Sequence, residues 1–560
     1  MPEEKNLLRE VESLKLEIKK LKSRKKYGLL WENKDEGVVL QCKEELPVLL
    51  EEQKKEVTTD KNSPTDILIE GDNYHALSVL NYTHQNKFDV IYIDPPYNTG
   101  AKDWKYNNNY VDSNDAYRHS KWLSFMSHRL KLAKNLLAKK GVLICTIDEN
   151  EFNRLGLLLE ELFPSHQISC ITIVHNPAGV QGDNFSYSHE YAFFVYPLGG
   201  RYIGLQKRET DVDVRNFRDV TGEESLRNAA ANCFYPIYVK NNKIIGFGDV
   251  CEKDFHPKNI NVKKQNGVIE IYPVDPQGIE RKWRFARQTV DSIKKDLEVK
   301  YIKNRGVYDI IRNKNVFNYK TVWTDSKYSA NNHGTQLLNQ IIKSGSFSYP
   351  KSIYAVMDCI RAASNENKNA LILDFFAGSG TTGHAVMLLN QEDKGNRRYI
   401  LCTNNENKIC EDVCYPRISN VIKGYKNLKN NNLITGLGGN LKYFKTDFVD
   451  AEQTDSNKKK LVDKSTEMLC LKEDCFDEVK RTKTYSIFTN NQSKHLGIIY
   501  DDAGIAPFKK EAERIGKKFI VYVFSLDESV REEEFEDIKN LVELKTIPAV
   551  ILNVYKRIFK

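Results

Sequence analysis

LILDFFAGSGTTGHAVMLLN, residues 371–390, is the stretch of sequence that decides the fold. Its first residues, 371–374, form an apolar run that indicates a buried strand, and the glycine-rich turn FAGSG follows at residues 376–380. A helical pattern then runs from Gly383 to Asn390. Glycines let a ligand approach the backbone, and the first turn of a helix offers N–H donors to a carboxylate or phosphate. We therefore expect a ligand-binding turn between a strand and a helix.

The turn departs from two common nucleotide-binding patterns. It does not have the G-x-G-x-x-G spacing, and it lacks the Lys-Ser/Thr pair of a P-loop, which disfavours a dehydrogenase and an ATPase. A further strand is predicted at residues 398–403, and Glu406 lies just past its end. A carboxylate there could accept ribose hydroxyls. The alternative for Glu406 is a solvated loop residue.

Earlier in the chain, apolar runs predict strands at residues 66–69, 88–93 and 141–147. The long amphipathic stretch 122–140 predicts a helix between the last two. Alternating strands and helices are typical of an α/β fold with a mostly parallel sheet. Ligands of such sheets bind beyond the carboxyl ends of the strands.

The tetrapeptide Asp94-Pro95-Pro96-Tyr97 directly follows the run at 88–93, so it lies at such an end. An exocyclic amine on a nucleobase is a poor nucleophile because its lone pair is delocalised into the ring. The Asp94 carboxylate and the Pro95 carbonyl could each accept an amine N–H, and Tyr97 could stack on the ring. The two prolines stiffen the turn before a substrate arrives. The motif favours an amino-methylating site over a plain proline-rich turn.

Composition bounds the class of protein. A chain of 560 residues allows roughly three or four domains. With 40% hydrophobic and 29% charged residues and a mean hydropathy of -0.55, it is typical of a soluble globular protein. We expect a cytoplasmic protein, because no apolar run could span a membrane and the N-terminus lacks a signal peptide. A net charge of +8 is compatible with a polyanionic partner without establishing one.

The eleven cysteines form no paired CxxC sets, so free thiols are expected. Cys402, Cys410 and Cys414 come nearest to a cluster, but no fourth ligand with suitable spacing is nearby. We therefore expect no metal site.

Five segments are expected along the chain. Residues 1–60 contain an amphipathic pattern at 5–26, which could be a coiled-coil subunit contact or a helix packed on its own domain. Residues 61–196 and 331–440 would complete one α/β domain around a less regular insert at 197–330. Residues 441–560 would form a small α/β domain of unknown role, with a strand at 519–524.

These motifs, in this order, resemble the β class of S-adenosylmethionine-dependent adenine-N6 DNA methyltransferases, in which DPPY precedes FxGxG and a target-recognition region lies between. Within that class the chain is most similar to the modification subunits of Type III restriction-modification systems, through most of residues 1–410. The supporting segments are KYGLLWE (26–32), IEGDNYHAL (69–77), IYIDPPYNTG (91–100), WLSFMSHRLKLAKNLL (122–137), GVLICTIDENE (141–151), HEYAFFVY (189–196), GTQLL (334–338), FSYPKS (347–352) and LDFFAGSGTTGHAVMLLN (373–390).

The resemblance implies a Rossmann-like methyltransferase sheet with an inserted target-recognition domain at 197–330, and S-adenosylmethionine as the cofactor. Asp94, Pro95, Pro96 and Tyr97 would be the catalytic residues. The target base would lie against His189 and Tyr191. The cofactor site would comprise Asp72, Asn98, Lys351, Asp374, Phe375, Phe376, Ala377, Gly378, Gly380, Thr381 and Glu406, with Lys351 near the cofactor's carboxylate and Asp374 in a supporting role. Asp72 could instead cap a helix, and Lys351 could be a surface lysine.

The insert carries the expected DNA contacts. Basic and aromatic residues alternate there, and we expect DNA to meet Arg281, Lys282, Trp283, Arg284 and Arg287, although a solvated basic helix face would have the same pattern. The resemblance implies double-stranded DNA, a second copy of the chain and a helicase-nuclease restriction subunit as partners, in a bacterial or archaeal cell. A solitary methyltransferase, a cytosine-N4 or RNA target, and a non-catalytic DNA-binding scaffold stay open as alternatives.

Overall fold

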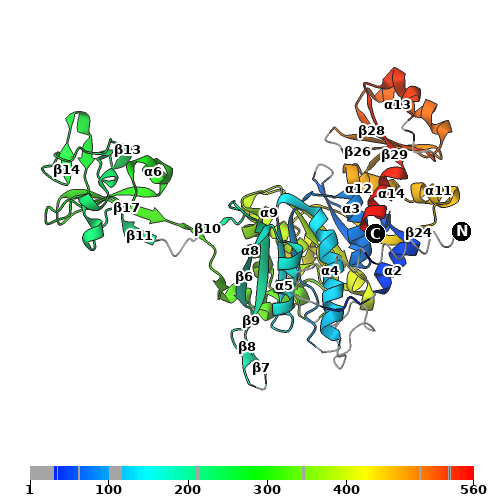
Figure 1. Ribbon diagram of the computed structural model, residues 1–560, viewed down its shortest axis with the longest axis horizontal. Coiled ribbons are helices and arrows are strands. Elements are labelled where there is room, and N and C mark those ends of the chain that lie inside the picture. Colours follow the sequence, from blue (N-terminus) through cyan, green and yellow to red (C-terminus); the bar gives the residue numbers. More distant parts are fainter. Residues whose placement is uncertain are drawn as a thin grey trace. The chain divides into compact units, whose positions relative to one another are not determined.

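The computed structural model describes residues 15, 31–34, 36–60, 63–99, 117–182, 184–207, 213–343, 347, 349–490, 493–526, 529 and 531–559. The amphipathic pattern at residues 5–26 lies outside the described residues, apart from Lys15. The chain divides into two compact units (Figure 1). Unit 1 comprises residues 1–204 and 320–560, and unit 2 comprises residues 205–319. The inserted unit is therefore shorter at both ends than the expected range 197–330.

Unit 1 is built on one large sheet. Its strand order is β1-β24-β3-β21-β20-β4-β5-β9-β6-β19, and β2 pairs with β24 at one side. The bounds are β1 (Glu45–Glu51), β2 (Val57–Thr58), β3 (Thr65–Glu70), β4 (Phe88–Ile93), β5 (Leu137–Ile147), β6 (His166–Val174), β9 (His189–Pro197), β19 (Val322–Trp323), β20 (Leu371–Asp374), β21 (Arg398–Thr403) and β24 (Asn440–Asp450).

The middle of this sheet is parallel, as expected, and its two sides are not. Strands β24, β3, β21, β20, β4 and β5 run parallel to one another. Strand β9 is antiparallel to both β5 and β6, and β1 is antiparallel to β24. The sheet is therefore mixed. The expected boundary at residue 441 is also displaced, because β24 joins the main sheet instead of the C-terminal domain.

Helices cover both faces of the sheet, which is why its central strands are continuous apolar runs. One core cluster joins Ile91, Ile93, Leu143 and Cys145 to residues of α3 (Asn73–Thr83), α4 (Arg118–Leu136) and α5 (Phe152–Leu162). Helix α8 (Ile353–Ser364) contacts β4 and β5 without joining that cluster, and α9 (Thr381–Asp393) packs against α8, so these two helices cover the opposite face.

The C-terminal part has its own sheet, in the order β25-β26-β27-β28-β29, and the predicted strand at 519–524 is β28. Helices α12 and α14 pack against α3, and the Tyr555 hydroxyl donates a hydrogen bond to the Pro47 carbonyl. The bounds are α11 (Asp455–Asp463), α12 (Thr466–Glu473), β25 (Asp477–Arg481), β26 (Tyr485–Thr489), β27 (His495–Ile499), α13 (Ile505–Ile515), β28 (Phe519–Phe524), β29 (Val542–Ile547) and α14 (Ala549–Ile558).

Unit 2 is built from small antiparallel sheets. One has the order β11-β17-β16 and another the order β13-β12-β15-β14. The bounds are β11 (Asp213–Asn216), β12 (Ile237–Lys240), β13 (Lys243–Phe247), β14 (Asn261–Lys263), β15 (Ile269–Ile271), α6 (Arg287–Val290), β16 (Leu297–Ile302) and β17 (Val307–Lys314). Its core surrounds Trp283, Phe217 and Tyr235.

No helix in the described part of the chain is both long and apolar enough to cross a membrane. Within the same residues, no group of three or more His, Cys, Asp and Glu side chains is arranged to hold a metal ion.

Candidate active site

The two sequence motifs meet at one edge of the main sheet. Strand β4 ends at Ile93 and the neighbouring parallel strand β20 ends at Asp374, so Asp94 and the glycine-rich turn leave the sheet side by side. Between them lies a cavity of about 200 Å³. Of the predicted residues, it is lined by Asp94, Pro95, Pro96, Lys351, Asp374, Phe376, Ala377, Gly378 and Thr381. Residues that the sequence did not single out also line it, among them Phe347, Tyr349, Thr382, Thr403 and Ile409.

The glycine-rich turn is held in a backbone conformation that suits glycine. Gly378 and Gly380 have φ values of +50° and +75°. A Cβ on Gly378 would lie 3.1 Å from the Phe347 ring, so a larger residue would reduce the cavity. Gly380 immediately precedes α9, whose first N–H groups are directed toward this end of the sheet. The turn therefore offers backbone donors to a ligand at close range.

Asp374 stabilises the glycine-rich turn through two hydrogen bonds. Its Oδ1 accepts a hydrogen bond from the Phe376 N–H at 2.9 Å, and its Oδ2 accepts one from the Thr382 hydroxyl at 2.5 Å. Burial raises the pKa of Asp374 to about 7, against the effect of these hydrogen bonds. Phe375 is fully buried, so a ligand could meet only its backbone.

Asp94 is fixed by side chains from other elements. The Thr146 hydroxyl on β5 donates to Asp94 Oδ1 at 2.6 Å, and the Lys351 ammonium lies 3.2 Å from the same oxygen. The Trp122 indole on α4 donates to the Pro96 carbonyl at 2.7 Å, which fastens the proline turn to the helix behind it. The carboxylate that the sequence predicts to bind the amine is thus held in one orientation by the protein itself.

A second carboxylate, Glu190 on β9, shares Lys351. The ammonium makes short contacts with both Glu190 Oε2 and the Tyr97 hydroxyl oxygen, and Tyr97 donates to Glu190 Oε2 at 3.1 Å. Burial acts to lower the pKa of Lys351, but Asp94 and Glu190 together raise it above its ordinary value. Lys351 is therefore a largely buried cation that contacts two residues of the DPPY motif, Asp94 and Tyr97.

The two residues beside Glu190 lie elsewhere. Successive side chains of a strand point to opposite faces, so His189 and Tyr191 face away from Asp94. They contact each other, with His189 Nε2 3.0 Å from the Tyr191 hydroxyl, and the Tyr191 ring lies 4.3 Å from that of Phe152 on α5. Neither residue lines the cavity. The strand's alternation could have identified Glu190 instead.

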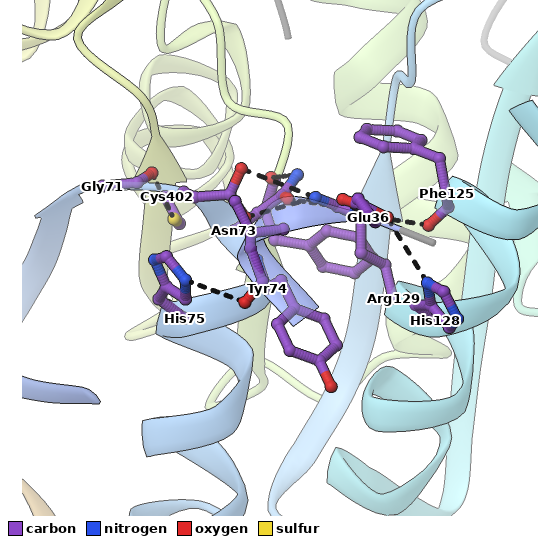
Figure 2. Close-up of polar contacts among 12 residues, drawn as sticks. Glu36, Gly71, Asn73, Tyr74, His75, Phe125, His128, Arg129 and Cys402 are labelled. Atoms are coloured by element: carbon purple, nitrogen blue, oxygen red, sulfur yellow. Dashed lines mark hydrogen bonds and ion pairs between the residues drawn. The ribbon is translucent and has the colours of Figure 1, made fainter. Parts of the chain in front are cut away.

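Asp72 has the alternative role considered from the sequence. It caps α3 by accepting a hydrogen bond from the Tyr74 N–H at 2.7 Å, and it lies 3.2 Å from the buried Arg129 guanidinium. Its neighbour Asn73 donates to the Phe375 carbonyl at 2.9 Å. The Asn73 side-chain oxygen accepts a hydrogen bond from the Arg129 guanidinium (Figure 2). The IEGDN segment therefore braces the glycine-rich turn from behind, through Asn73.

Asn98 and Glu406 also lie outside the cavity lining. Asn98 is buried with φ at +57°, and its amide donates to Glu151, which is fully buried. Glu406 is half-buried at the start of a 3-10 helix (Glu406–Lys408) after β21. The cavity wall near it is formed by Thr403 and Ile409.

The basic segment of unit 2 is largely engaged in the unit's own structure. Trp283 is fully buried, which argues against contact with bases. Arg281 pairs with Asp275 at 2.9 Å, and Arg287 pairs with Asp291 at 2.7 Å. Arg284 lies 3.5 Å from Asp219, whereas Lys282 is half-buried.

A family model described as DNA methylase matches residues 88–413, a range that contains both motifs and the whole cavity. The chain belongs to this family of DNA methylases. The methylase is 31% identical over 354 residues to the Type II methyltransferase M.KpnI of Klebsiella pneumoniae, covering 60% of this chain and 79% of that protein. The prediction of a DNA methyltransferase is confirmed.

The methylase is also 28% identical over 437 residues to the Type III restriction-modification enzyme EcoPI Mod subunit of Escherichia phage P1. This match covers 69% of the chain but only 64% of the subunit, so the chain spans just under two thirds of that relative. The resemblance to modification subunits is thereby confirmed. A crystal structure of the M1.HpyAVI-SAM complex is 12% identical with a TM-score of 0.28, covering 63% of the methylase and 97% of that chain.

Proposed function

We propose that this methylase transfers a methyl group from S-adenosylmethionine to N6 of an adenine flipped out of double-stranded DNA. One observation carries the proposal: the amine-binding turn at Asp94 and the glycine-rich turn at Gly378 line the same cavity. A methyl donor held by one turn would therefore meet an amine held by the other. An aspartate, not a serine, before Pro-Pro-Tyr favours adenine over cytosine by resemblance to the family.

The residues present fit S-adenosylmethionine. A Cβ at Gly378 would intrude on the space beside Phe347, so the glycine keeps the backbone open to a ligand. Ala377, Gly378, Gly380 and Thr381 would hold the methionine end, with its carboxylate near the N-terminus of α9. When bound, S-adenosylmethionine supplies an electrophilic methyl group on a sulfonium centre.

The protein's own part is orientation. Asp94 accepts an N–H of the exocyclic amine, which raises electron density on the nitrogen, and Thr146 and Lys351 keep the carboxylate in place. The Lys351 ammonium lies 4.5 Å from the centroid of the Tyr97 ring, over one face, so the base would stack on the other face. As the N–C bond forms and the methyl–sulfur bond breaks, the nitrogen gains positive charge and then loses one proton to water. The flipped base costs a few kcal/mol of unstacking, which stacking and hydrogen bonds offset.

Single-molecule sequencing of DNA from cells that express the methylase tests the proposal. Wild-type protein should leave N6-methyladenine at one recurring sequence, and Asp94→Ala should leave none. N4-methylcytosine would favour the cytosine alternative. DNA binding without any modified base would favour the scaffold.

The β16–β17 hairpin of unit 2 is the surface that we propose for DNA contact. Lys300, Lys303 and Arg305 are exposed around its tip, and Tyr301 is 50% exposed between them. Within the described part of unit 2, none of the three cations forms an ion pair, in contrast to Arg281 and Arg287. Cations with an adjacent aromatic ring suit a nucleic-acid backbone and bases, and a two-stranded ribbon fits the major groove.

Replacing Lys300, Lys303 and Arg305 together by Ala should weaken DNA binding and reduce its salt dependence, by about one ion per lost phosphate contact. The matched control replaces Lys243, Lys253 and Lys258, which are exposed lysines elsewhere in the same unit. An equal loss of DNA affinity in both triple variants would show that the hairpin has no special role in DNA binding.

We propose that the methylase works in the cytoplasm with a second copy of itself and a helicase-nuclease restriction subunit. The similarity to the EcoPI Mod subunit of a Type III restriction-modification enzyme supports a restriction partner. The alternative is a solitary methyltransferase. Sedimentation of the purified protein would give its oligomeric state. Co-purification with the product of a neighbouring helicase-nuclease gene would distinguish the two kinds of system.

A further inference from the structure

One ammonium lies between two carboxylates at the amine-binding turn. Lys351 is 3.2 Å from Asp94 and in short contact with Glu190. Asp94 keeps 26% of its side chain exposed toward the cavity, whereas Glu190 keeps only 6%. Together the three side chains carry one net negative charge. Glu190 is therefore the buried partner of the cation, and Asp94 is the member that a substrate can reach.

This balance matters for the chemistry at Asp94. Positive charge develops on the amine nitrogen during methyl transfer, and a nearby ammonium would oppose it. Opposite charges in a site poor in water interact strongly. With Glu190 in contact with the ammonium, the cation can fix Asp94 without cancelling the negative charge that the amine meets.

We propose that Glu190 and Lys351 are positioning residues for the reaction. Lys351 fixes the Asp94 carboxylate in place, and Glu190 balances the charge of Lys351 so that Asp94 stays a strong acceptor for the amine. The inference rests on the proposed function, because it assigns these roles in methyl transfer at Asp94. It adds to the DPPY motif a residue on β9, Glu190, and one that lies two residues before α8, Lys351.

The other titratable groups that face this trio are Tyr92, Tyr97, Cys145, Asp148, His175, Cys359 and Asp374. Burial raises the pKa of the two tyrosines and two cysteines and lowers that of the histidine, so these five are neutral. Burial also raises the pKa of Asp148 to about 6 and that of Asp374 to about 7. Lys351 lowers the pKa of Asp148, so its removal also affects that group. Repeating each variant in an Asp148→Asn background separates the contribution of Asp148 from that of the trio.

The pH dependence of single-turnover methylation tests the proposal. Without its cation, Asp94 takes up a proton more readily, so Lys351→Met should move the acid limb of the profile upward by about one pH unit or more. Glu190→Gln leaves the cation unbalanced, so it should move the acid limb downward and lower the plateau rate by about tenfold. Lys351→Arg and Glu190→Asp keep the charges and should restore the wild-type profile in part.

Matched controls are Lys139→Met and Glu161→Gln, which remove exposed charges of the same kinds from unit 1 and should leave the profile unchanged. Thermal unfolding and binding of S-adenosylhomocysteine show whether each variant is folded. If Lys351→Met and Glu190→Gln lowered the rate equally at every pH, the two residues would be merely structural and the proposal would be wrong. A wild-type protein that methylated no DNA would overturn the proposed function itself, and this inference with it.

Discussion

Thr146 donates its hydroxyl hydrogen to Oδ1 of Asp94 across 2.6 Å, from the strand beside the one that Asp94 follows. Lys351 approaches the same oxygen at 3.2 Å. Both protein contacts therefore converge on Oδ1, and a substrate amine would be met by Oδ2. A strand residue and a loop residue together fix the plane of the carboxylate before the amine arrives.

Thr146→Val keeps the shape of this side chain and removes only its hydroxyl. A hydrogen bond to a charged group contributes about 1.5–3 kcal/mol, so we expect single-turnover methylation to fall by roughly tenfold to a hundredfold. Affinity for the cofactor should not change, because Thr146 does not line the cavity. Thr435→Val, on an exposed strand of the same unit, is the control. A loss confined to cofactor binding would contradict the assigned role.

The sequence was sufficient to predict the site's position but not its whole composition. Asp94 and Gly378 could be brought together because both follow apolar strands, and the carboxyl ends of parallel strands share an edge. Glu190 could not be assigned to the site in this way, because a single glutamate among aromatic residues matches no known motif. The alternation of β9 was the available signal, because it places residue 190 on one face and residues 189 and 191 on the other.

Two other predictions from the sequence were wrong for the same reason. Trp283 lies among basic residues, which suggested an exposed DNA-binding segment, yet it packs against Phe217 and is fully buried. Strand β24 lies between β1 and β3 although almost four hundred residues separate it from them. Both outcomes depend on contacts between distant segments, and neither composition nor local periodicity contains that information.

Arg129 is fully buried on α4 and connects this helix to Glu36 and to Asp72 (Figure 2). It pairs with Glu36 at 2.7 Å and with Asp72 at 3.2 Å. Removing one partner of a buried ion pair leaves an uncompensated charge, so Arg129→Met should lower the free energy of unfolding by about 3–5 kcal/mol. Denaturant unfolding would measure this loss.

Adding Glu36→Gln to Arg129→Met should restore part of that stability, because the buried carboxylate is then gone. Lys131→Met, an exposed position on the same helix, should change stability little. If the double variant were less stable than Arg129→Met, the unpaired charge of Glu36 would not be the cause.

Trp283 is expected to matter for the stability of unit 2 rather than for DNA contact. Its ring stacks on Phe217 at 5.4 Å, and its indole donates to the Tyr235 carbonyl at 2.8 Å. Trp283→Ala should cost about 3–5 kcal/mol through the cavity that it creates. Hydrogen exchange should show faster opening of residues 213–319. A folded variant that had lost only DNA affinity would contradict this interpretation.

Asp66 on β3 should make stability depend on pH. Burial raises its pKa to about 8, although the Tyr399 N–H, 2.8 Å from Oδ1, acts in the opposite direction. The folded state therefore holds a proton that the unfolded state has released, and stability from this group falls as the pH rises from about 4 to 8.

Asp66→Asn keeps an acceptor for Tyr399 and cannot ionise. Its advantage in melting temperature over the wild type should grow across this pH range and level off above it. Asp254→Asn, at an exposed position, should show no such trend. If the difference in melting temperature between Asp66→Asn and the wild type stayed constant with pH, Asp66 would not be the group responsible.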